Sequence, residues 1–401
     1  MLRVEVITDL SCADELSADW DALLRVTPEA TYFQSLSWLR VYWKHYAPGQ
    51  KLRLLVVRDG DEIVGFVPLV IRKEPSPLGS VRILTYPADY WGSFYGPIGR
   101  DPQSLLRSAM EHVLRVRRDW DLLDLRFAPP EDSDPTRTVA EMARAGLAPH
   151  SMVVAETSLI DLPGSLEEYF ASRTSKWRNN YRRWFRRLEQ RGELSFTRFR
   201  PRGIQFNDAD PRWDLYDACE EVARNSWQAK SLNGTTLTHG TVRPFLRDVH
   251  EAACAAGAAE INLLMLDGRP LAFLYCYHYG TAVFGLRIGY DENLSRDGVG
   301  NVLYMHVIDD SIKRGDRILD LGPGSLAAKR AITSRILPIY RHTWGNPRSL
   351  RGLAWHAKRK LDAWRGKPAA AILDCSEADA AAALEGAREA EPAAAEMSAS
   401  S

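Results

Sequence analysis

The same order of predicted elements occurs twice in this sequence, and no other feature constrains the fold as strongly. In each half, a strand precedes two helices, a strand hairpin, a third strand, a helix and a last strand. Both hairpins turn at an Asp-Gly pair, Asp59-Gly60 in the first half and Asp267-Gly268 in the second. Asp-Gly between apolar runs is a strong hairpin signal. The repetition predicts a tandem duplication of one α/β unit, in which a mixed, largely antiparallel sheet is flanked by helices.

The first half shows the unit in full. Ser35 or Ser37 can cap its second helix, which carries apolar residues at helical spacing. Apolar runs predict strands at 2–8, 51–58, 63–72, 80–86, 121–127 and 152–161, and helices at 16–26, 34–46 and 102–118, with a short helix ending near Gly146.

The second half begins with a long predicted helix, 166–191, that has two different faces. One face is apolar and is expected to contact a core: Phe170, Trp177, Tyr181, Trp184, Phe185 and Leu188. The other is basic: Arg173, Lys176, Arg178, Arg182, Arg183, Arg186 and Arg187. Strands are then predicted at 194–200, 261–266, 271–279, 281–290 and 317–321, and helices at 213–227, 242–256, from the loop to 314, and at 350–364.

Composition excludes several classes of protein. A chain of 401 residues with 45% apolar residues can form two ordinary domains. Lysine plus arginine equals aspartate plus glutamate, so the whole chain has no bias toward nucleic acid or membrane. The N-terminus has no apolar run of a signal peptide, and no segment approaches a membrane span. We therefore expect a cytoplasmic protein without a membrane partner.

The five cysteines are scattered, odd in number and without a Cys-x-x-Cys pair. They support neither a disulfide framework nor a zinc site. We expect reduced thiols and no bound metal.

A glycine-containing loop between the strand at 281–290 and the next helix is the strongest candidate site. The strand ends at Tyr290-Asp291, and the loop contains Gly298 and Gly300. Free backbone N–H groups and the dipole at a helix start favour a phosphate there, and glycine lets a ligand approach the backbone closely. The pattern predicts an anion site at this loop.

Three stretches resemble the GNAT superfamily of acyl-CoA-dependent N-acetyltransferases. They are 175–180, which runs into the arginine-rich helix, 225–230, and the residues from Gly289 through Gly300 with Asp320 and Lys329. More closely, 3–365 resembles the tandem-GNAT acetyltransferases associated with cellulose and exopolysaccharide biosynthesis, which in turn resemble Fem-type aminoacyltransferases of peptidoglycan synthesis. The superfamily loop is usually Arg/Gln-x-x-Gly-x-Gly/Ala, whereas Arg296 here is one residue closer to Gly298.

The resemblance implies a fold of two tandem GNAT-like domains and acetyl-CoA or another acyl-CoA as co-substrate. It divides the chain into a degenerate domain at 1–163, an acyl-CoA-binding domain with the basic helix at 164–365, and a tail at 366–401 that is rich in alanine, glutamate and serine and is expected to be disordered. The residues implied in binding the co-substrate are Arg287, Ile288, Gly289, Arg296, Asp297, Gly298, Val299, Gly300 and Asn301.

Acyl transfer to an amine needs a donor for the developing oxyanion, a base for the amine and an acid for the thiolate. The resemblance implies that a backbone N–H from 287–290 is the donor. Asp291 is the candidate base, and Tyr290 or Tyr304 the candidate acid. Each also has a purely structural interpretation, and ordered water can replace a dedicated base. No serine or cysteine has a nucleophile setting, so we expect direct transfer.

Lys329, Asp320 and Trp227 are candidate substrate-binding residues. Lys329 could bind a carboxylate or phosphate of the acceptor, or be a solvated lysine. Asp320 could orient Lys329 or satisfy backbone donors at the end of a strand. Trp227 could line an acceptor pocket or belong to a core, and His278, within an apolar strand, is expected to be a core histidine.

The basic face of the long helix has three interpretations: a solvated surface, contact with an acidic or phosphorylated acceptor, or binding of RNA. The loop of the first half, 96–102, contains Pro97 and Pro102, which lack N–H groups. We infer that the first half binds no co-substrate and instead shapes the acceptor groove.

We predict direct transfer of an acyl group, most readily acetyl, to an amine of an amino sugar or small metabolite. A Fem-type aminoacyltransferase that uses aminoacyl-tRNA and a non-catalytic acyl-CoA-binding protein are alternatives. The stretch 318–325 also resembles the first motif of S-adenosylmethionine-dependent methyltransferases, with Gly322 and Gly324, but it lacks a third glycine and the chain after it is short.

Overall fold

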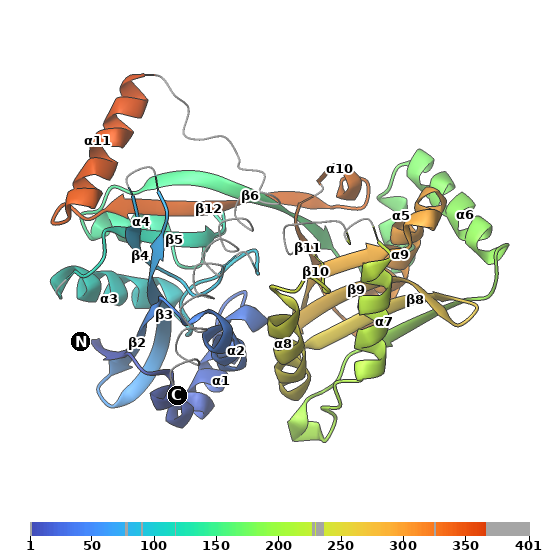
Figure 1. The fold of residues 1–401 in the computed structure, drawn as a ribbon, viewed down its shortest axis with the longest axis horizontal. Coiled ribbons are helices and arrows are strands. Elements are labelled where there is room, and N and C mark those ends of the chain that lie inside the picture. The colour runs from blue at the N-terminus through green and yellow to red at the C-terminus, as the bar shows by residue number, and fades with distance from the viewer. Residues whose placement is uncertain are drawn as a thin grey trace, which may run out of the picture. The chain divides into compact units, whose positions relative to one another are not determined.

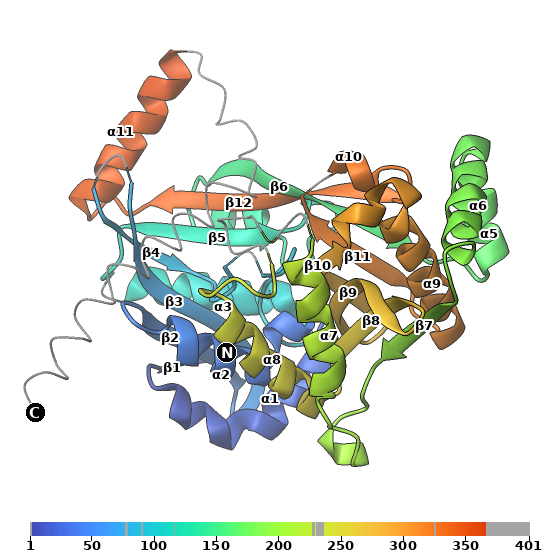
Figure 2. The same cartoon turned by 45° about the vertical axis from the view of Figure 1, so that its right-hand side comes forward.

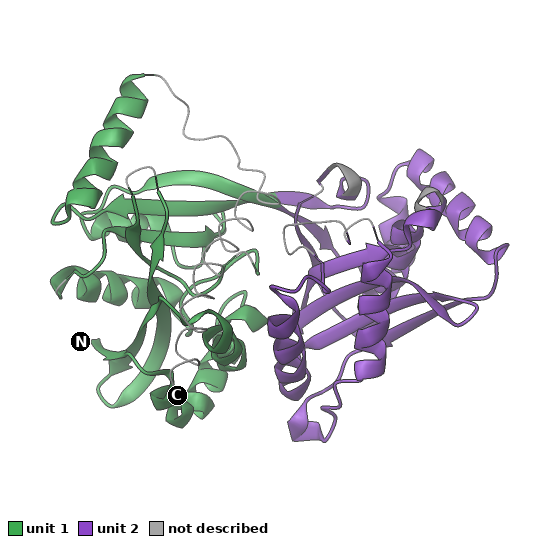
Figure 3. Ribbon diagram, in the orientation of Figure 1, with its two compact units in different colours: residues 1–156, 337–378, 386–401 green, residues 157–336, 379–385 purple. Residues whose placement is uncertain are grey.

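The computed structural model describes residues 2–365 except 77–78, 90, 117, 227–228, 230–235 and 325. Its described residues form two compact units (Figure 3), one made of the chain up to Glu156 together with 337–365, and the other of Thr157–Ile336. The predicted domains placed 337–365 in the second half, whereas these residues belong to unit 1. The predicted tail, 366–401, lies outside the described residues.

Unit 1 is built around the strand order β1-β2-β3-β4-β5-β12 (Figure 1). Its strands are β1 (Arg3–Ile7), β2 (Lys51–Asp59), β3 (Glu62–Glu74), β4 (Val81–Thr85), β5 (Leu122–Ala128), most of β6 (His150–Asp161) and most of β12 (Arg335–Gly345). Its helices are α1 (Ser17–Val26), α2 (Leu36–Tyr46), α3 (Pro102–Arg115), α4 (Thr138–Arg144) and α11 (Leu350–Trp364), with short η1 (Leu10–Leu16) and η2 (Tyr32–Gln34).

Unit 2 repeats this plan with the strand order β7-β8-β9-β10-β11-β6. Its strands are β7 (Leu194–Phe199), β8 (Ala259–Leu266), β9 (Arg269–Tyr279), β10 (Ala282–Tyr290), β11 (Ile318–Pro323) and the last residues of β6. Its helices are α5 (Leu166–Ala171), α6 (Ser175–Glu189), α7 (Trp213–Arg224), α8 (Arg243–Ala256), α9 (Val299–Arg314) and α10 (Leu326–Lys329), with short η3 (Ile204–Phe206) and η5 (Glu292–Asp297).

The α/β fold with mixed, largely antiparallel sheets is therefore confirmed, and the order of elements does occur twice. The last strand of each half contributes to the other unit. Thr157–Asp161 of β6 pairs with β11 in unit 2, and Tyr340–Gly345 of β12 pairs with β5 in unit 1. β12 was not predicted, because Pro338 lies within it and proline argues against a paired strand.

In unit 1 the helices cover both faces of the sheet. Trp20 of α1 stacks on Phe66 of β3 with ring centroids 4.5 Å apart. Leu105 of α3 lies against Gly65, the preceding residue of the same strand. Successive residues of a strand point to opposite faces. Helices α1 and α3 therefore lie on opposite faces of the sheet.

Unit 2 has the same layers (Figure 2). Tyr275 of β9 contacts Tyr216 of α7 and His250 of α8 on one face. Its neighbours Leu274 and Cys276 belong to the apolar core that contains α9 on the other face. Helices α7 and α8 thus correspond to α1 and α2, and α9 corresponds to α3. Helix α6 packs outside α9, with Trp177 and Leu188 buried in the same core, as its apolar face predicted.

The predicted helix 166–191 is two helices, which corrects the prediction. The chain leaves helical geometry between Ala171 and Ser175, where Thr174 caps α6 by accepting from the Trp177 N–H at 3.2 Å. Nη1 of Arg178 donates to carbonyl groups at the end of α5, including that of Phe170 at 3.2 Å. A side-chain cap at this point satisfies the orphan amides of a new helix. Among the described residues, no helix is long and apolar enough to cross a membrane.

Candidate functional site

Strand β10 separates from its parallel neighbour, β11, before β10 ends. It pairs with β11 only at Ala282, Val283 and Phe284, although β10 continues to Tyr290. Its antiparallel pairing with β9 shifts register between Gly285 and Arg287, which is a β-bulge. A bulge adds a residue, bends the strand and increases its twist. The two strands therefore form a wedge in which backbone groups of β10 on the β11 side have no strand partner among the described pairs.

The end of β11 forms the other side of the wedge. The side chain of Lys329 hydrogen-bonds to the backbone there. Nζ of Lys329 donates to the carbonyl oxygens of Leu321, Gly322 and Pro323, at 2.8, 2.9 and 3.2 Å. Once β11 has left β10, these carbonyls need another donor, and an ammonium has three. Lys329 thus stabilises the separated strand.

Burial lowers the pKa of Lys329 to about 8, while the nearby carboxylate of Asp320 opposes the shift. The carboxylate of Asp320 accepts from the Gly322 N–H at 2.8 Å and from the Thr157 hydroxyl. Both residues therefore take part in shaping the turn after β11. That these two residues bind the acceptor stays a prediction, and the contacts within the chain favour the structural interpretation. The glycines of the methyltransferase-like stretch belong to this same turn.

The start of α9 lies at the end of β10 and has an open N-terminus. Gly298 is its N-cap with φ +66°, and no side chain caps the helix. Trp184 of α6 covers this glycine, because a Cβ placed on Gly298 would lie 2.4 Å from the indole ring. Gly298 is therefore required both by its left-handed conformation and by the contact with Trp184. The amides of Val299 and Gly300, the first two of the helix, therefore have no side-chain acceptor at the N-cap and can bind water or a ligand.

Asp297, the acidic residue next to Gly298, forms an ion pair with an arginine of the same chain. The carboxylate of Asp297 is nearly buried and accepts from Nη2 of Arg191 at 2.7 Å. An ion pair offsets the negative charge that would otherwise repel an anion at the helix start. Sequence reasoning missed Arg191 and Trp184 as partners of this loop, and only the fold brings them to it.

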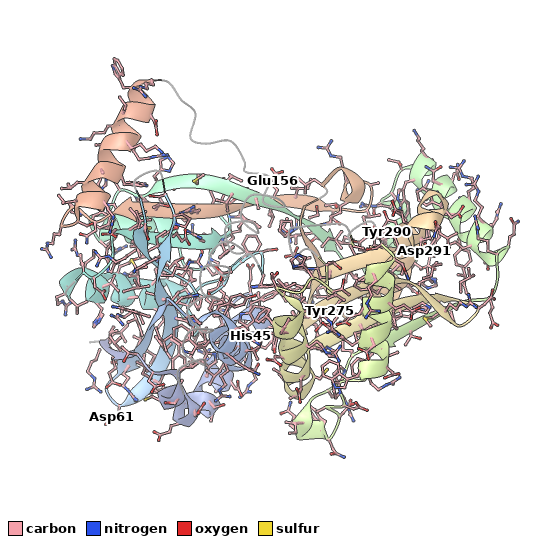
Figure 4. All side chains as sticks on the ribbon, in the orientation of Figure 1. His45, Asp61, Glu156, Tyr275, Tyr290 and Asp291 are labelled. Carbon is pink, nitrogen blue, oxygen red and sulfur yellow. The ribbon has the colours of Figure 1, made fainter. Side chains whose placement is uncertain are left out.

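The two candidate tyrosines lie close to the helix start. Figure 4 shows Tyr290 and Asp291 at the end of β10. A Cβ on Gly300 would lie 3.5 Å from the Tyr290 ring, so the ring packs on the first turn of α9. Tyr304, one turn further along α9, is buried, and burial raises the pKa of its hydroxyl above the ordinary value. Tyr304 therefore keeps its proton at neutral pH.

Asp291 terminates the strand and starts the loop. Its carboxylate accepts from the backbone N–H of Asn293 at 2.9 Å and from Nδ2 of Asn293 at 3.0 Å. Its own N–H donates to the carbonyl of Leu271 at 3.0 Å. This is an Asx-turn, which positions the loop. The contacts favour the structural interpretation of Asp291, and its role as a base stays a prediction.

The other implied co-substrate residues are placed along the same segment. Nη1 of Arg287 donates to the carbonyl of Leu286, and Ile288 packs against the core. Gly289 lies against the Phe273 ring, and Val299 is buried. The Asn301 N–H donates to the Gly298 carbonyl at 2.9 Å. Arg296 lies in η5, but its side chain is outside the described residues, as is all of Trp227.

A buried ion network fixes the far end of α9. Nη2 of Arg198 donates to Glu260 at 2.7 Å, and Nη1 donates to Asp310 of α9 at 2.8 Å. Arg200 binds both Glu260 and Asp316, which lies between α9 and β11. These charged hydrogen bonds hold α9 to the sheet. Nearby, burial lowers the pKa of His278 to about 4, which agrees with a neutral core histidine.

The basic face of α6 is exposed. Arg182 donates to the Asn179 side chain and Arg183 to the Asn180 side chain, each one turn earlier in the helix. Arg186 and Arg187 have no carboxylate partner among the described residues. Within the described chain, no cluster of metal-ligating side chains is present.

Comparison with known proteins identifies this segment. Residues 175–330 match the family model described as Acetyltransferase (GNAT) domain. The match runs from the start of α6 past α10, so it contains the wedge, the loop and α9. No curated protein matches the chain.

Two solved structures have a similar fold. FemX has a TM-score of 0.58 and 13% identity, with 88% of this chain and 99% of that chain covered. The C-terminal domain (DUF2156) of a protein named as a lysylphosphatidylglycerol synthetase from Agrobacterium fabrum has a TM-score of 0.53 and 14% identity, covering 88% of this chain and 98% of that chain. At such identities they show the fold. The domain match over 175–330 assigns a GNAT acetyltransferase domain to this segment.

Proposed function

We propose, from the premise that residues 175–330 form a GNAT acetyltransferase domain, that the chain transfers an acyl group from acyl-CoA directly to an amine. Acetyl-CoA is the first co-substrate to test. The proposal depends on two features that occur together. Strand β10 separates from β11 after Phe284, and helix α9 starts without a side-chain cap. Neither feature alone is specific, but together they place a strand segment without a described β11 partner beside a possible anion site.

The residues present fit the diphosphate and the pantetheine arm of a coenzyme A. Backbone amides of Val299 and Gly300 lie in the first turn of α9, where the helix dipole favours negative charge. The ion pair of Arg191 with Asp297 removes the nearest negative charge. The extended arm carries amide groups, which can hydrogen-bond to the part of β10 beyond its last parallel pair with β11, as an added strand would.

The chain's own groups can then assist the transfer. A bound acyl-CoA supplies an activated thioester. A main-chain N–H from 287–290 would donate to the thioester carbonyl and stabilise negative charge on its oxygen. The Tyr304 hydroxyl carries a proton at neutral pH and is the candidate donor of that proton to the leaving thiolate. Burial raises its pKa, so a developing thiolate must lie close to the hydroxyl for the transfer. Because Asp291 is engaged in a turn, we assign removal of the amine proton to water.

Direct transfer agrees with the state of the cysteines. Burial raises the pKa of the thiols of Cys219, Cys254 and Cys276, so each stays protonated at neutral pH. A thiol, unlike a thiolate, is a poor nucleophile. Cys12 is exposed but lies in unit 1.

The acceptor and its pathway rest on the resemblance alone. An amine of an amino sugar or small metabolite, and an association with polysaccharide biosynthesis, stay predictions. The same holds for the role of the first half in shaping the acceptor groove.

A second candidate is transfer from an aminoacyl-tRNA. The exposed arginines of α6, without carboxylate partners among the described residues, favour it, because unpaired cations bind phosphate backbones. The tryptophan of this helix that is most buried, Trp177, belongs to the core and offers no stacking surface.

One experiment tests the proposal and separates the two donors. Release of free thiol from acetyl-CoA is measured with a panel of amines, in parallel with deacylation of aminoacyl-tRNA. The proposal expects amine-dependent thiol release and no use of aminoacyl-tRNA. Tyr304→Phe should fold normally and lose about tenfold or more in kcat with little change in KM, since it keeps the ring and loses the proton. Turnover of aminoacyl-tRNA with no thiol release would overturn the proposal.

A further inference from the structure

Among the described residues, helix α11 packs on unit 1 through one face, and Arg351 at its start also lies 3.7 Å from Asp121. Gly352 is so close to Asn346 that a Cβ would lie 2.1 Å from its carbonyl oxygen. Trp355 packs on the small core of β4 and β5, and Nε2 of His356 lies 2.8 Å from the Gly345 carbonyl oxygen. Arg359, one turn later, contacts His150. These positions recur three and four residues apart, so they form one face of the helix.

The opposite face is apolar and open to solvent. Leu350 is 86% exposed, Leu353 49%, Leu361 41% and Trp364 83%. With the exposed Ala357 between them, these residues follow the spacing of a single helical stripe. An apolar stripe on a helix normally packs against a core. An apolar stripe that is exposed to solvent instead marks an interaction site. We call these five residues the α11 stripe.

Cations flank the α11 stripe. Lys358 and Arg365 lie on one side of it and Lys360 on the other, by helical spacing. No described carboxylate pairs with any of these three residues. The single acidic residue of the helix, Asp362, is 3.3 Å from Arg359 and is therefore neutralised. The exposed surface thus combines apolar side chains with unpaired positive charge.

The exposed face of α11 differs from that of the other basic helix, α6. It is also basic, but its aromatic face is turned into the core of unit 2. Helix α6 can therefore offer charge alone, whereas α11 offers charge together with leucines and a tryptophan. Basic flanks, leucines and a tryptophan on one helical face are the composition that lies in a lipid interface, with the helix parallel to the membrane.

We propose that α11 docks the protein on a membrane surface that contains anionic lipids, with the α11 stripe inserted among the acyl chains and the flanking lysines and arginine on the headgroups. This inference departs from the expectation of no membrane partner, because that expectation used the net charge of the whole chain. It is independent of the proposed acyl transfer, since α11 belongs to unit 1 and lies outside the matched domain.

The test uses the full chain and vesicles of stated composition. Co-sedimentation is measured with phosphatidylcholine vesicles and with vesicles that also contain phosphatidylglycerol. Binding should be tighter by about tenfold or more with the anionic lipid, and high salt should remove that advantage. Leu353→Ser combined with Trp364→Ser should lose about tenfold or more on anionic vesicles. Both side chains are exposed, so the melting temperature should not change.

Two further variants locate the binding surface. Lys358→Gln with Lys360→Gln should reduce only the advantage of the anionic lipid. Arg182→Gln with Arg186→Gln on α6 is the matched control and should bind vesicles as the wild type does. Brominated lipids should quench the fluorescence of the wild type more than that of Trp364→Phe, which reports insertion directly.

Three outcomes would overturn the proposal. One is a wild-type chain that does not sediment with anionic vesicles. Another is loss of vesicle binding in the α6 control with retention in the Leu353/Trp364 variant. The third is a wild-type dimer that becomes a monomer in the Leu353/Trp364 variant, because a second copy of the chain would then cover the α11 stripe.

Discussion

The loops before α3 and α9 occupy the same place in the repeated order of elements, yet their backbone amides are used differently. In unit 1, Ile98 exchanges two backbone hydrogen bonds with Phe66 of β3, each 2.8 Å long. The Gly99 N–H donates to the Thr27 hydroxyl at 2.8 Å. Asp101 then caps α3 by accepting from the Ser104 N–H. The amides of this loop are satisfied within the chain, whereas α9 begins without a side-chain cap.

The strands that lead to the two loops differ as well. β4 ends at Thr85, directly after its parallel pairs with β5 at Ile83 and Leu84. β10 bulges and continues for six residues after its last parallel pair, Phe284 with Asp320. The strand and loop before α3 therefore show neither a strand that continues far past its parallel pairs nor an uncapped helix start. The comparison teaches that two regions with the same order of elements can differ in which backbone groups the chain satisfies, and only groups left unsatisfied are available to a ligand.

The largest expected effect comes from Gly298→Ala. The new Cβ would meet the Trp184 ring, and alanine is strained at φ +66°. We expect a loss of about 2–5 kcal/mol in stability and loss of thermal protection by acetyl-CoA. Chemical denaturation and a thermal shift assay measure the two quantities. If acetyl-CoA protected this variant as well as the wild type, the proposed difference in ligand binding between the loops before α3 and α9 would be contradicted.

Trp184→Ala should have the next largest effect. Removing the indole leaves Gly298 uncovered and costs about 2–3 kcal/mol, since the ring is only partly buried. In the double variant with Gly298→Ala, the clash is absent, so the two losses should not add. A double-mutant cycle in urea measures the coupling. Additive losses would contradict the contact between Trp184 and the loop.

Lys329→Met should cost about 1–2 kcal/mol at pH 7, because three carbonyl oxygens of β11 lose their donor. The folded-state pKa of Lys329 is about 8 and its ordinary value is 10.5. Below pH 8 both folded and unfolded chains carry the proton, so the cost of burying the charge is constant. Above pH 8 the folded chain releases the proton first, which raises its stability relative to the unfolded chain.

The wild type should therefore gain stability relative to Lys329→Met between pH 8 and about pH 10. Melting temperatures of both proteins across this range test the sign. A pH-independent difference would mean that Lys329 is solvated. That result would restore the interpretation of this lysine as a free acceptor-binding group.

Asp101→Ala in unit 1 should have the smallest effect. It removes the cap of α3 and costs about 1 kcal/mol. Acetyl-CoA affinity should stay at the wild-type value, because the proposal assigns the co-substrate to the start of α9 and not to α3. Calorimetric titration checks this, and a weakened affinity would show that unit 1 also binds the co-substrate.

Much of the fold could be predicted, because its signals are local. Asp59-Gly60 and Asp267-Gly268 mark the two hairpins, and Ser35 does cap α2 by accepting from the Trp38 N–H. The position of β12 could not be predicted, because Pro338 within it argues against a paired strand. Its partner β5 is also far away in the sequence. The break before Ser175 was missed because Thr174 lies inside a continuous apolar stripe.

The candidate site was only partly predictable. Gly298 and Gly300 identified the helix start correctly, since glycine is local evidence of backbone conformation. That Trp184 covers Gly298 and that Arg191 neutralises Asp297 are contacts between separate elements, which no spacing in the sequence reveals. Asp101 next to Pro102 does carry a local signal, an N-cap residue before an N1 proline, and it could have identified the closed loop of unit 1.

The most direct test compares two substitutions at Gly300. Alanine keeps the backbone N–H, and its Cβ would make an ordinary contact of 3.5 Å with the Tyr290 ring. Proline is tolerated in the first turn of a helix but removes the N–H. If main-chain amides at the start of α9 hold the diphosphate, calorimetric titration with acetyl-CoA should give Gly300→Ala an affinity near the wild-type value and Gly300→Pro a loss of about tenfold or more. Equal affinities in two folded variants would contradict the account.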